Sequence, residues 1–221
     1  MFKKYIVWSS LGFVVSNDKR MRYSVFRDFV QLVNSHNDCF SLGTNLDIIV
    51  DGKDVYLDTF KKTSYFKFEY DKYKSRIPSE YISISFRFLN LLGDFNEPNS
   101  IPLPPEQQNL IIEKCKKELL NFMSNKKFNG CYLILSDSLR FLNSVKGIPR
   151  VIVFPENITH IASISSTDKN AEVSFLKTII DFNLILDAGE IYRFESSFLR
   201  RSGFPYTAAL CSGKKMSIHQ F

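Results

Sequence analysis

Residues suited to binding a phosphate stand at two points in the chain. Arg87 ends the apolar run that begins at Tyr81, and its planar guanidinium could hold a pyrophosphate through two parallel hydrogen bonds. Ser202 and Gly203 lie in a loop of small residues ahead of Ala208, where a helix is expected. The free N–H groups and the positive dipole end of such a helix favour an anion. These residue types support the binding of a diphosphate group.

Simpler roles are open to each polar residue of this kind. Arg87 could instead form an ion pair with Asp94 or Glu97 in the following loop. Asp137 stands in a Ser-Asp-Ser turn, where an aspartate is often only a helix N-cap. His160 lies in a loop after an apolar run, and either faces a ligand or makes an ordinary hydrogen bond. Arg87, Asp137, His160 and the loop at Ser202 are nevertheless treated as one candidate site, because all four follow predicted strands.

Asp181 is a carboxylate among the apolar residues of a predicted helix. Its neighbours include Ile180 and Leu184, and a charge in apolar surroundings needs a partner. Lys177, one helical turn earlier, could be that partner. Asp181 could also accept hydrogen bonds from a bound base or ribose. The sequence is consistent with both roles.

Alternating strands and helices must position these residues. Apolar, β-branched runs predict strands at 81–88, 131–135, 151–154 and 190–194. Helices are predicted along 110–126, directly after residues 136–138, along 171–188 and after the small-residue loop. This order predicts an α/β fold, a Rossmann-like doubly wound parallel sheet with helices on both faces. Ligands of such sheets bind outside the carboxyl ends of the strands, where Arg87, Asp137, His160 and Ser202 all fall.

A boundary between two parts is predicted between Asp71 and Pro78, where the sequence is charged and poor in core residues. Residues 1–78 would form a short N-terminal α/β part, and residues 79–221 the main domain. The first part is expected to contain a strand at 5–8, a helix at 22–34, a hairpin around Asp51-Gly52 and an alternating strand at 66–70. The strand at 5–8 is favoured over a secretory signal, because small and polar residues soon interrupt the apolar run.

Composition excludes several classes of protein. With 221 residues, 44% hydrophobic residues and 21 phenylalanines, the chain is suited to a well-filled globular core. The net charge of +6 is spread over scattered pairs of basic residues, so we expect no nucleic-acid partner. The four cysteines form no CxxC pair and no histidine stands at ligand spacing, so no metal site is expected. No run reaches the ~18 apolar residues of a membrane span.

The order and spacing of these motifs resemble a known family. They are the strand ending in Arg87, the segment LILSDSLRFL at 133–142, the segment 181–188, and Ser202-Gly203-Phe204 ahead of Ala208-Ala209. Together they resemble the donor-nucleotide half of the fucosyltransferase superfamily, which are inverting glycosyltransferases of the GT-B fold. The resemblance covers about residues 79–212. The family usually has a histidine two residues before the arginine, and this chain has Ser85 there.

The resemblance implies roles for individual residues. Arg87 would contact the β-phosphate of a GDP-sugar donor, Asp137 would be the aspartate of the strand-turn segment, and Asp181 would receive the guanine or ribose. The pyrophosphate would meet Ser202, Gly203 and Phe204. His160 and Lys177 are added to the donor-binding set from their positions, and the resemblance implies no metal. Asp94 and Glu97, in the loop after Arg87, are the carboxylates to test as catalytic base.

Two functions are therefore expected. The first is transfer of a sugar, fucose or a related deoxyhexose, from a nucleotide-sugar to a polysaccharide or other glycan acceptor. The alternative is a non-catalytic nucleotide- or sugar-binding module derived from such an enzyme. A cytoplasmic location is expected, and the pI near 9.0 would suit peripheral association with an anionic membrane.

Overall fold

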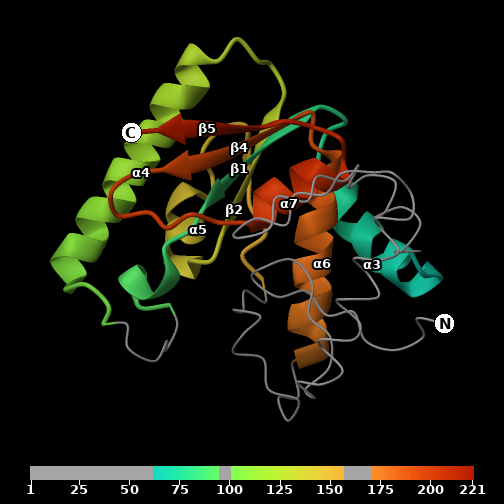
Figure 1. Ribbon diagram of the computed structural model, residues 1–221, viewed down its shortest axis with the longest axis horizontal. Helices are drawn as coiled ribbons and strands as arrows, with labels where there is room; N and C mark the ends of the chain where they lie inside the picture. The colour runs from blue at the N-terminus through green and yellow to red at the C-terminus, as the bar shows by residue number, and fades with distance from the viewer. Residues whose placement is uncertain (1–61, 95–100, 157–170) are drawn as a thin grey trace, which may run out of the picture.

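The computed structural model describes residues 62–94, 101–156 and 171–221. The predicted strand at 5–8, the helix at 22–34, the hairpin at Asp51-Gly52, Glu97 and His160 lie outside these residues. The boundary near residue 78 stays a prediction. Within the described part, helices and strands alternate from α3 to β5 (Figure 1).

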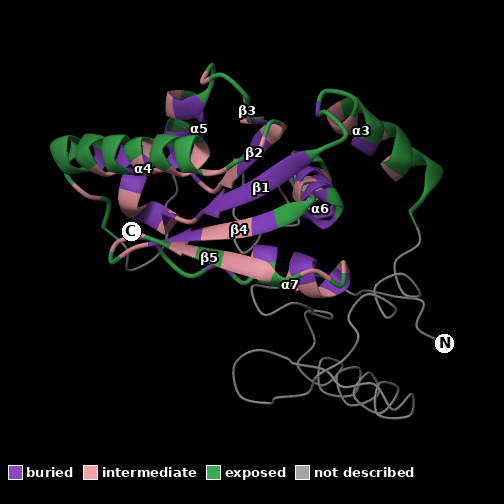
Figure 2. Ribbon diagram, turned by 90° about the horizontal axis from the view of Figure 1, so that it is seen from above, coloured by how far each residue is buried: buried purple, intermediate pink, exposed green. Residues whose placement is uncertain are grey.

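Five parallel strands form one sheet, in the order β3-β2-β1-β4-β5. The strands are β1 (Tyr81–Phe86), β2 (Cys131–Ser136), β3 (Val151–Ile152), β4 (Glu190–Glu195) and β5 (Met216–Gln220). In the central rung, Ile84 lies between Ile134 of β2 and Tyr192 of β4. All six residues of β1 are buried (Figure 2), as a central strand covered on both faces requires.

The helices connect the strands and cover both faces of the sheet. They are α3 (Ser64–Lys74), α4 (Pro105–Asn125), α5 (Leu139–Val145), α6 (Ala171–Asp187) and α7 (Phe204–Cys211), with a 3₁₀ turn, η1 (Leu89–Leu92), after β1. The predicted Rossmann-like doubly wound parallel sheet is confirmed. The helix predicted from residue 110 begins earlier, at Pro105, because proline suits the first turn of a helix.

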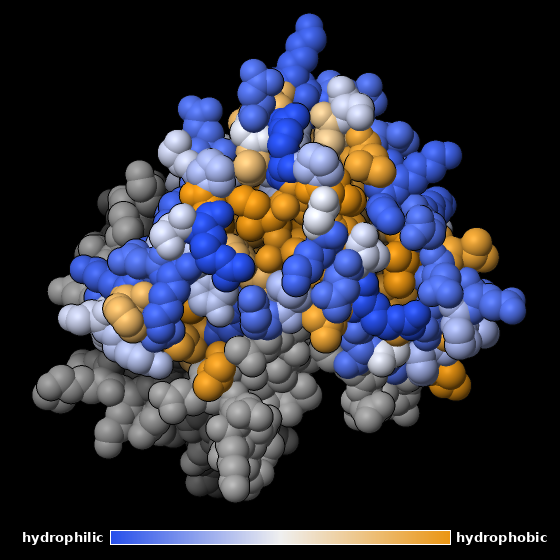
Figure 3. Space-filling model, turned by 180° about the vertical axis from the view of Figure 1, so that it is seen from behind, coloured by the Kyte–Doolittle hydropathy of each residue, from blue (hydrophilic) through white to orange (hydrophobic). Residues whose placement is uncertain are grey.

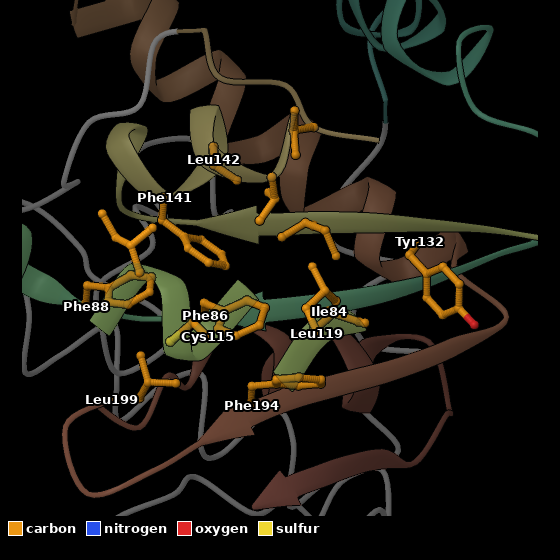
Figure 4. Close-up of a cluster of buried hydrophobic side chains, with 14 of the residues drawn as sticks. Ile84, Phe86, Phe88, Cys115, Leu119, Tyr132, Phe141, Leu142, Phe194 and Leu199 are labelled. Atoms are coloured by element: carbon orange, nitrogen blue, oxygen red, sulfur yellow. The ribbon is translucent and has the colours of Figure 1, made fainter. Parts of the chain in front are cut away.

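One face of the sheet packs against α4 and α5. Phe86 of β1 contacts the rings of Phe141 on α5 and Phe194 on β4, with ring centroids 4.6 and 4.7 Å apart. Cys115 and Leu119 of α4 belong to the same buried cluster (Figure 4). Seen from behind, the molecule shows apolar side chains gathered in the middle of the face and hydrophilic ones around them (Figure 3).

The opposite face packs against α6, α7 and α3. Tyr81 and Ile191 of the sheet share one buried cluster with Leu184 of α6, Ala208 of α7 and Tyr70 of α3. The residues of β1 thus alternate between the two cores, since Ile84 and Phe86 face α4 and α5 while Tyr81 faces α6.

The strand predicted at 66–70 is wrong, because this segment belongs to α3. The side chain of Thr63 caps the helix by accepting a hydrogen bond from the N–H of Phe66, at 3.1 Å. Phe66 and Tyr70, four residues apart, stack on one face of the helix with ring centroids 5.9 Å apart. The alternating pattern is therefore also a helical i, i+4 pattern, and packing of Tyr70 against α6 selects the helix. The strand β5, which follows α7, was not predicted.

Candidate functional site

The candidate site lies at the carboxyl edge of the sheet, between β1 and β4. The connections from β1 lead through α4 to β2 on one side, whereas β4 is followed by α7 and β5 on the other side. The strand order therefore reverses between β1 and β4, and such a switch point is where open α/β sheets bind ligands. In Figure 1 the loop leaving the arrowhead of β4 turns back there toward α7.

The loops after β1 and β4 are joined at this point. The N–H of Arg200, in the loop after β4, donates a hydrogen bond of 2.9 Å to the carbonyl oxygen of Arg87. Arg87 directly follows β1 and is partly exposed. The structure thus brings the segment that carries Arg87 against the loop 196–203 that contains Ser202, as the strand-end argument expected.

The carboxylate of Asp137 holds the turn that follows Arg87. Its Oδ1 accepts a hydrogen bond of 2.8 Å from the N–H of Phe88, and its Oδ2 accepts one of 2.9 Å from the N–H of Leu89. Burial is the main influence on the pKa of Asp137 and raises it, whereas these N–H groups and the nearby Arg87 act in the opposite direction. The helix cap predicted for Asp137 belongs to its neighbour Ser138, whose hydroxyl accepts from the N–H of Phe141 at 3.1 Å.

The turn after β1 also contains strained backbone. Leu89 has φ +53°, in the left-handed region that residues other than glycine rarely adopt. Such conformations persist only where the surrounding structure enforces them, and they concentrate at functional sites. The carboxylate bond to the N–H of Leu89 is part of that enforcement.

The loop after β4 is anchored by Arg193, which is largely buried, and by the buried Glu195, neither of which was predicted as a site residue. Nη1 of Arg193 donates a hydrogen bond of 2.8 Å to the carbonyl oxygen of Ser202, and Nη2 pairs with Oε1 of Glu195. The side chains of Arg193 and Glu195 point to the same face of β4 because they are two residues apart. Two charged residues at alternating positions on either side of the apolar Phe194 were the signal that could have identified them.

The small-residue loop leads into α7 as predicted. Gly203 occupies the N-cap position of α7, and the hydroxyl of Ser202 accepts a hydrogen bond of 3.4 Å from the N–H of Phe204. Ser202 is buried. The first turn of α7, with the positive end of its dipole, thus follows directly after the loop that leaves the carboxyl end of β4. Donor binding by Ser202, Gly203 and Phe204 stays a prediction.

Two serines of β1 lie beneath this edge. The hydroxyls of Ser83 and Ser85 are buried and have no hydrogen-bond partner among the residues that the structure describes. Ser85 lies opposite Arg193 in the ladder between β1 and β4. Ser85 therefore adjoins Arg193, whose side chain is largely buried.

Asp94 contacts the start of α5. Its Oδ1 accepts a hydrogen bond of 3.2 Å from the N–H of Arg140. The guanidinium of Arg140 donates in turn to the carbonyl oxygen of Leu92 at 3.1 Å and to Oδ1 of Asn109 at 3.2 Å, and it also pairs with Gln108. Oδ2 of Asp94 is buried without a partner in the described ranges. Asp94 thus helps to fix the loop after η1, and a role as catalytic base stays a prediction.

Asp181 forms an ion pair with Lys177, the first of the two roles that the sequence left open. Nζ of Lys177 lies 2.7 Å from both carboxylate oxygens. The Lys177 side chain is only 4% exposed and lies against the ring of Tyr73 on α3. Burial raises the pKa of Asp181, although Lys177 acts to lower it. This pair ties α6 to α3, and nucleotide contacts by either residue stay a prediction.

The residues that the structure describes contain no group of three or more histidine, cysteine, aspartate or glutamate residues that could hold a metal ion. None of the helices from α3 to α7 is long and apolar enough to cross a membrane.

Comparison with known proteins gives similarity in structure alone. No protein-family model and no curated protein matches the chain. A NodZ α-1,6-fucosyltransferase co-crystallised with GDP is 13% identical with TM-score 0.48, over 87% of this chain and 59% of that one. Another NodZ structure, soaked with GDP-fucose, is 16% identical with TM-score 0.46, over 72% of this chain and 45% of that one.

An Arabidopsis thaliana FUT1 variant in complex with GDP is 14% identical with TM-score 0.38, over 80% of this chain and 34% of that one. The chain is thus similar in structure to fucosyltransferases. It spans between about a third and three fifths of the length of these three structures.

Proposed function

We propose that this chain binds a nucleoside-diphosphate sugar at the switch point between β1 and β4 and transfers the sugar to a glycan acceptor. The single observation that carries the proposal is the hydrogen bond between the Arg200 N–H and the Arg87 carbonyl oxygen. It joins the segment bearing the guanidinium to the loop that precedes α7, at the place where α/β sheets bind their ligands. The motif resemblance at 79–212 supports a sugar nucleotide, with fucose or a related deoxyhexose as the sugar.

The proposed mechanism uses charge stabilisation of the leaving group. The Arg87 guanidinium would donate paired hydrogen bonds to the β-phosphate, and the positive end of the α7 dipole would complement the same charge. These positive groups stabilise the negative charge that grows on the diphosphate as the glycosidic bond breaks. Asp94 and Glu97 are the carboxylates to test as the base that activates the acceptor hydroxyl. A cytoplasmic location is proposed because the spacing of the four cysteines suits a reducing compartment, and nearness to a membrane surface is proposed on the basic charge.

The alternative function is a binding module without transfer activity. It is favoured by one observation, since Oδ1 of Asp94 is already bonded to the N–H of Arg140 at the start of α5. A carboxylate in that position supports the loop and is less available to an acceptor hydroxyl. The module and the enzyme share the diphosphate site, so binding and transfer must be measured separately.

Calorimetric titration of the full chain tests the site. GDP, UDP, GDP-fucose, guanosine and inorganic pyrophosphate are titrated into the wild type, Arg87→Gln and the control Lys117→Gln, which removes a charge from an exposed position of α4. Loss of a charged hydrogen bond costs about 1.5–3 kcal/mol, so Arg87→Gln should raise the Kd for diphosphate ligands about 10- to 100-fold. Lys117→Gln should change it less than about twofold, because exposed charges contribute little.

The same ligands separate the two functions. Release of GDP from GDP-fucose in the presence of glycan acceptors supports transfer, and tight binding with no release supports the module. If the wild type binds none of the diphosphates, or if Arg87→Gln and Lys117→Gln behave alike, the proposed diphosphate site is wrong.

A further inference from the structure

The turn after β1 is held in a strained conformation by a residue from the neighbouring strand connection. Both oxygens of Asp137 accept N–H groups, from Phe88 at 2.8 Å and from Leu89 at 2.9 Å. Leu89 has φ +53°, a conformation in which its Cβ crowds the following carbonyl group. Phe88 is fully buried between the sheet and α5. The backbone that directly follows Arg87 is therefore fixed by packing.

Arg87 therefore lies between two backbone clamps. On one side its carbonyl oxygen accepts the N–H of Arg200 from the loop after β4. On the other side the next two N–H groups are bound by the carboxylate of Asp137, which follows β2. Asp137 follows β2 and Arg200 follows β4. Both of these strands pair directly with the central strand β1.

We propose that Asp137 is a positioning residue, which aims the Arg87 side chain by holding the strained turn at Phe88 and Leu89, and does not itself bind the nucleotide. This inference rests on the proposed diphosphate site. It assigns Asp137 a different role from the direct donor contact expected from the sequence. The two oxygens that a nucleotide would need are already bonded to backbone N–H groups.

A positioning role and a direct charge effect of Asp137 predict opposite changes in the affinity for a diphosphate. The carboxylate of Asp137 lies close enough to Arg87 for their charges to attract. Removing that negative charge would by itself strengthen the binding of a diphosphate anion. If positioning dominates, the same change weakens binding, because the guanidinium is no longer held toward the ligand.

The test replaces Asp137 and then relieves the strain that it maintains. Asp137→Asn keeps the shape but substitutes an N–H donor for one of the two acceptors. Leu89→Gly allows φ above zero without steric cost, and Leu89→Ala is its matched control because it shortens the side chain and keeps the Cβ. Leu89 is half-buried and contributes to neither core cluster. Calorimetry measures the Kd for GDP in the full chain for each single and double variant.

Asp137→Asn should raise the Kd for GDP about tenfold, the effect of about 1.4 kcal/mol. Asp137→Asn with Leu89→Gly should recover at least about threefold of this loss, and with Leu89→Ala it should recover none. Tighter or unchanged binding in Asp137→Asn overturns the proposal. So does a loss that Leu89→Gly and Leu89→Ala leave equally unrepaired, since that result identifies Asp137 as a direct ligand.

Amide hydrogen exchange at Phe88 and Leu89 provides a readout that needs no nucleotide. Asp137→Asn should accelerate exchange at these two N–H groups by about tenfold or more, while the N–H groups within β1 stay protected. Unchanged exchange at both positions overturns the proposal. If Asp137→Asn does not fold, Asp137→Glu serves in its place, because it keeps the charge and displaces the carboxylate by one methylene group.

The two proposals fail in different ways. If the wild type binds no diphosphate while exchange at Phe88 and Leu89 responds to Asp137→Asn, the proposed function is wrong and the clamp on the turn stands. If the wild type binds GDP but the Leu89 pair gives no selective recovery, the diphosphate site stands and the positioning role is wrong.

Discussion

The ion pair between Lys177 and Asp181 gives the most quantitative prediction. Each partner is replaced by a neutral residue of similar shape, in Lys177→Met, Asp181→Asn and the double variant. The ammonium group lies 2.7 Å from both carboxylate oxygens. Each single change therefore leaves the other charge in a poorly solvated position, whereas the double change removes both charges together.

The magnitude follows from burial. Breaking a fully buried ion pair costs about 3–5 kcal/mol, and replacing both partners is often nearly neutral. Lys177 is 4% exposed but the Asp181 side chain is 24% exposed, so we expect Asp181→Asn, which strands the buried ammonium, to cost about 3 kcal/mol. Lys177→Met should cost about 2 kcal/mol, because water still reaches the carboxylate, and the double variant about 1 kcal/mol. The coupling energy is then about 4 kcal/mol.

Urea denaturation of the four proteins at pH 7 measures these values. The expected loss of about 3 kcal/mol in Asp181→Asn corresponds to a fall in Tm of roughly 6–12 °C for a domain of this size. Additive losses, or an Asp181→Asn variant as stable as the wild type, would refute the reasoning from burial. Unchanged stability together with lost GDP binding would instead make Asp181 a nucleotide ligand.

Three further predictions concern packing, reactivity and the sheet edge. Phe194→Ala should cost about 3–5 kcal/mol in the free energy of unfolding, because the fully buried ring contacts four others, while Phe68→Ala on the exposed face of α3 should cost less than about 0.5 kcal/mol; similar losses for the two variants would contradict this description of the core. Burial raises the pKa of Cys115 to about 12, so mass mapping after iodoacetamide should find it modified only in unfolded protein; rapid modification of the folded chain would oppose this. Lys126 holds the pKa of Glu190 below its usual range, so this pair stabilises the folded state above about pH 4.3 and its contribution disappears as pH falls. Lys126→Met should cost less than about 1 kcal/mol in the free energy of unfolding, because the carboxylate is exposed. It should also weaken the dependence of stability on pH in the acid range.

The sheet could be predicted from the sequence because its central strands have strand patterns. The run from Tyr81 to Phe86 alternates and contains β-branched residues, the run from Cys131 is continuously apolar, and the helices between the strands have apolar residues at helical spacing. Edge strands lack this signal. The strand β5 is half-exposed and pairs only with β4, so its existence depends on a tertiary partner.

The segment 66–70 shows how tertiary contacts override a local pattern. Its alternation fits a strand, but the hydroxyl of Tyr70 donates to Asp187 at the far end of α6, and Tyr70 packs into the core shared with that helix. These contacts connect residues more than a hundred positions apart. Propensity and periodicity contain no information about such a distance.

The positions of the candidate-site residues could be predicted from the sequence, but their contacts could not. Parallel topology brings the ends of β1, β2 and β4 to one edge, so the positions of Arg87, Asp137 and Ser202 followed from strand assignment alone. The hydrogen-bond partner of each side chain did not follow. A carboxylate such as that of Asp137 can accept equally well from a ribose hydroxyl or from a backbone N–H. The hydrogen bonds from the N–H groups of Phe88 and Leu89 to Asp137 depend on the path of the chain after β1. The spacing of residues in the sequence does not give that path.

The location of the strained turn has a topological cause. A central strand has neighbours on both sides, so the chain leaving β1 must turn between the connections that follow β2 and β4. Asp137 and Arg200 contribute to that turn from opposite sides. A guanidinium placed there is oriented by three strands at once, whereas one at the edge strand β5 would have a single neighbour. An arginine that follows β1 is therefore held more firmly for ligand binding than one that follows an edge strand. The strained conformation of Leu89 results from this arrangement.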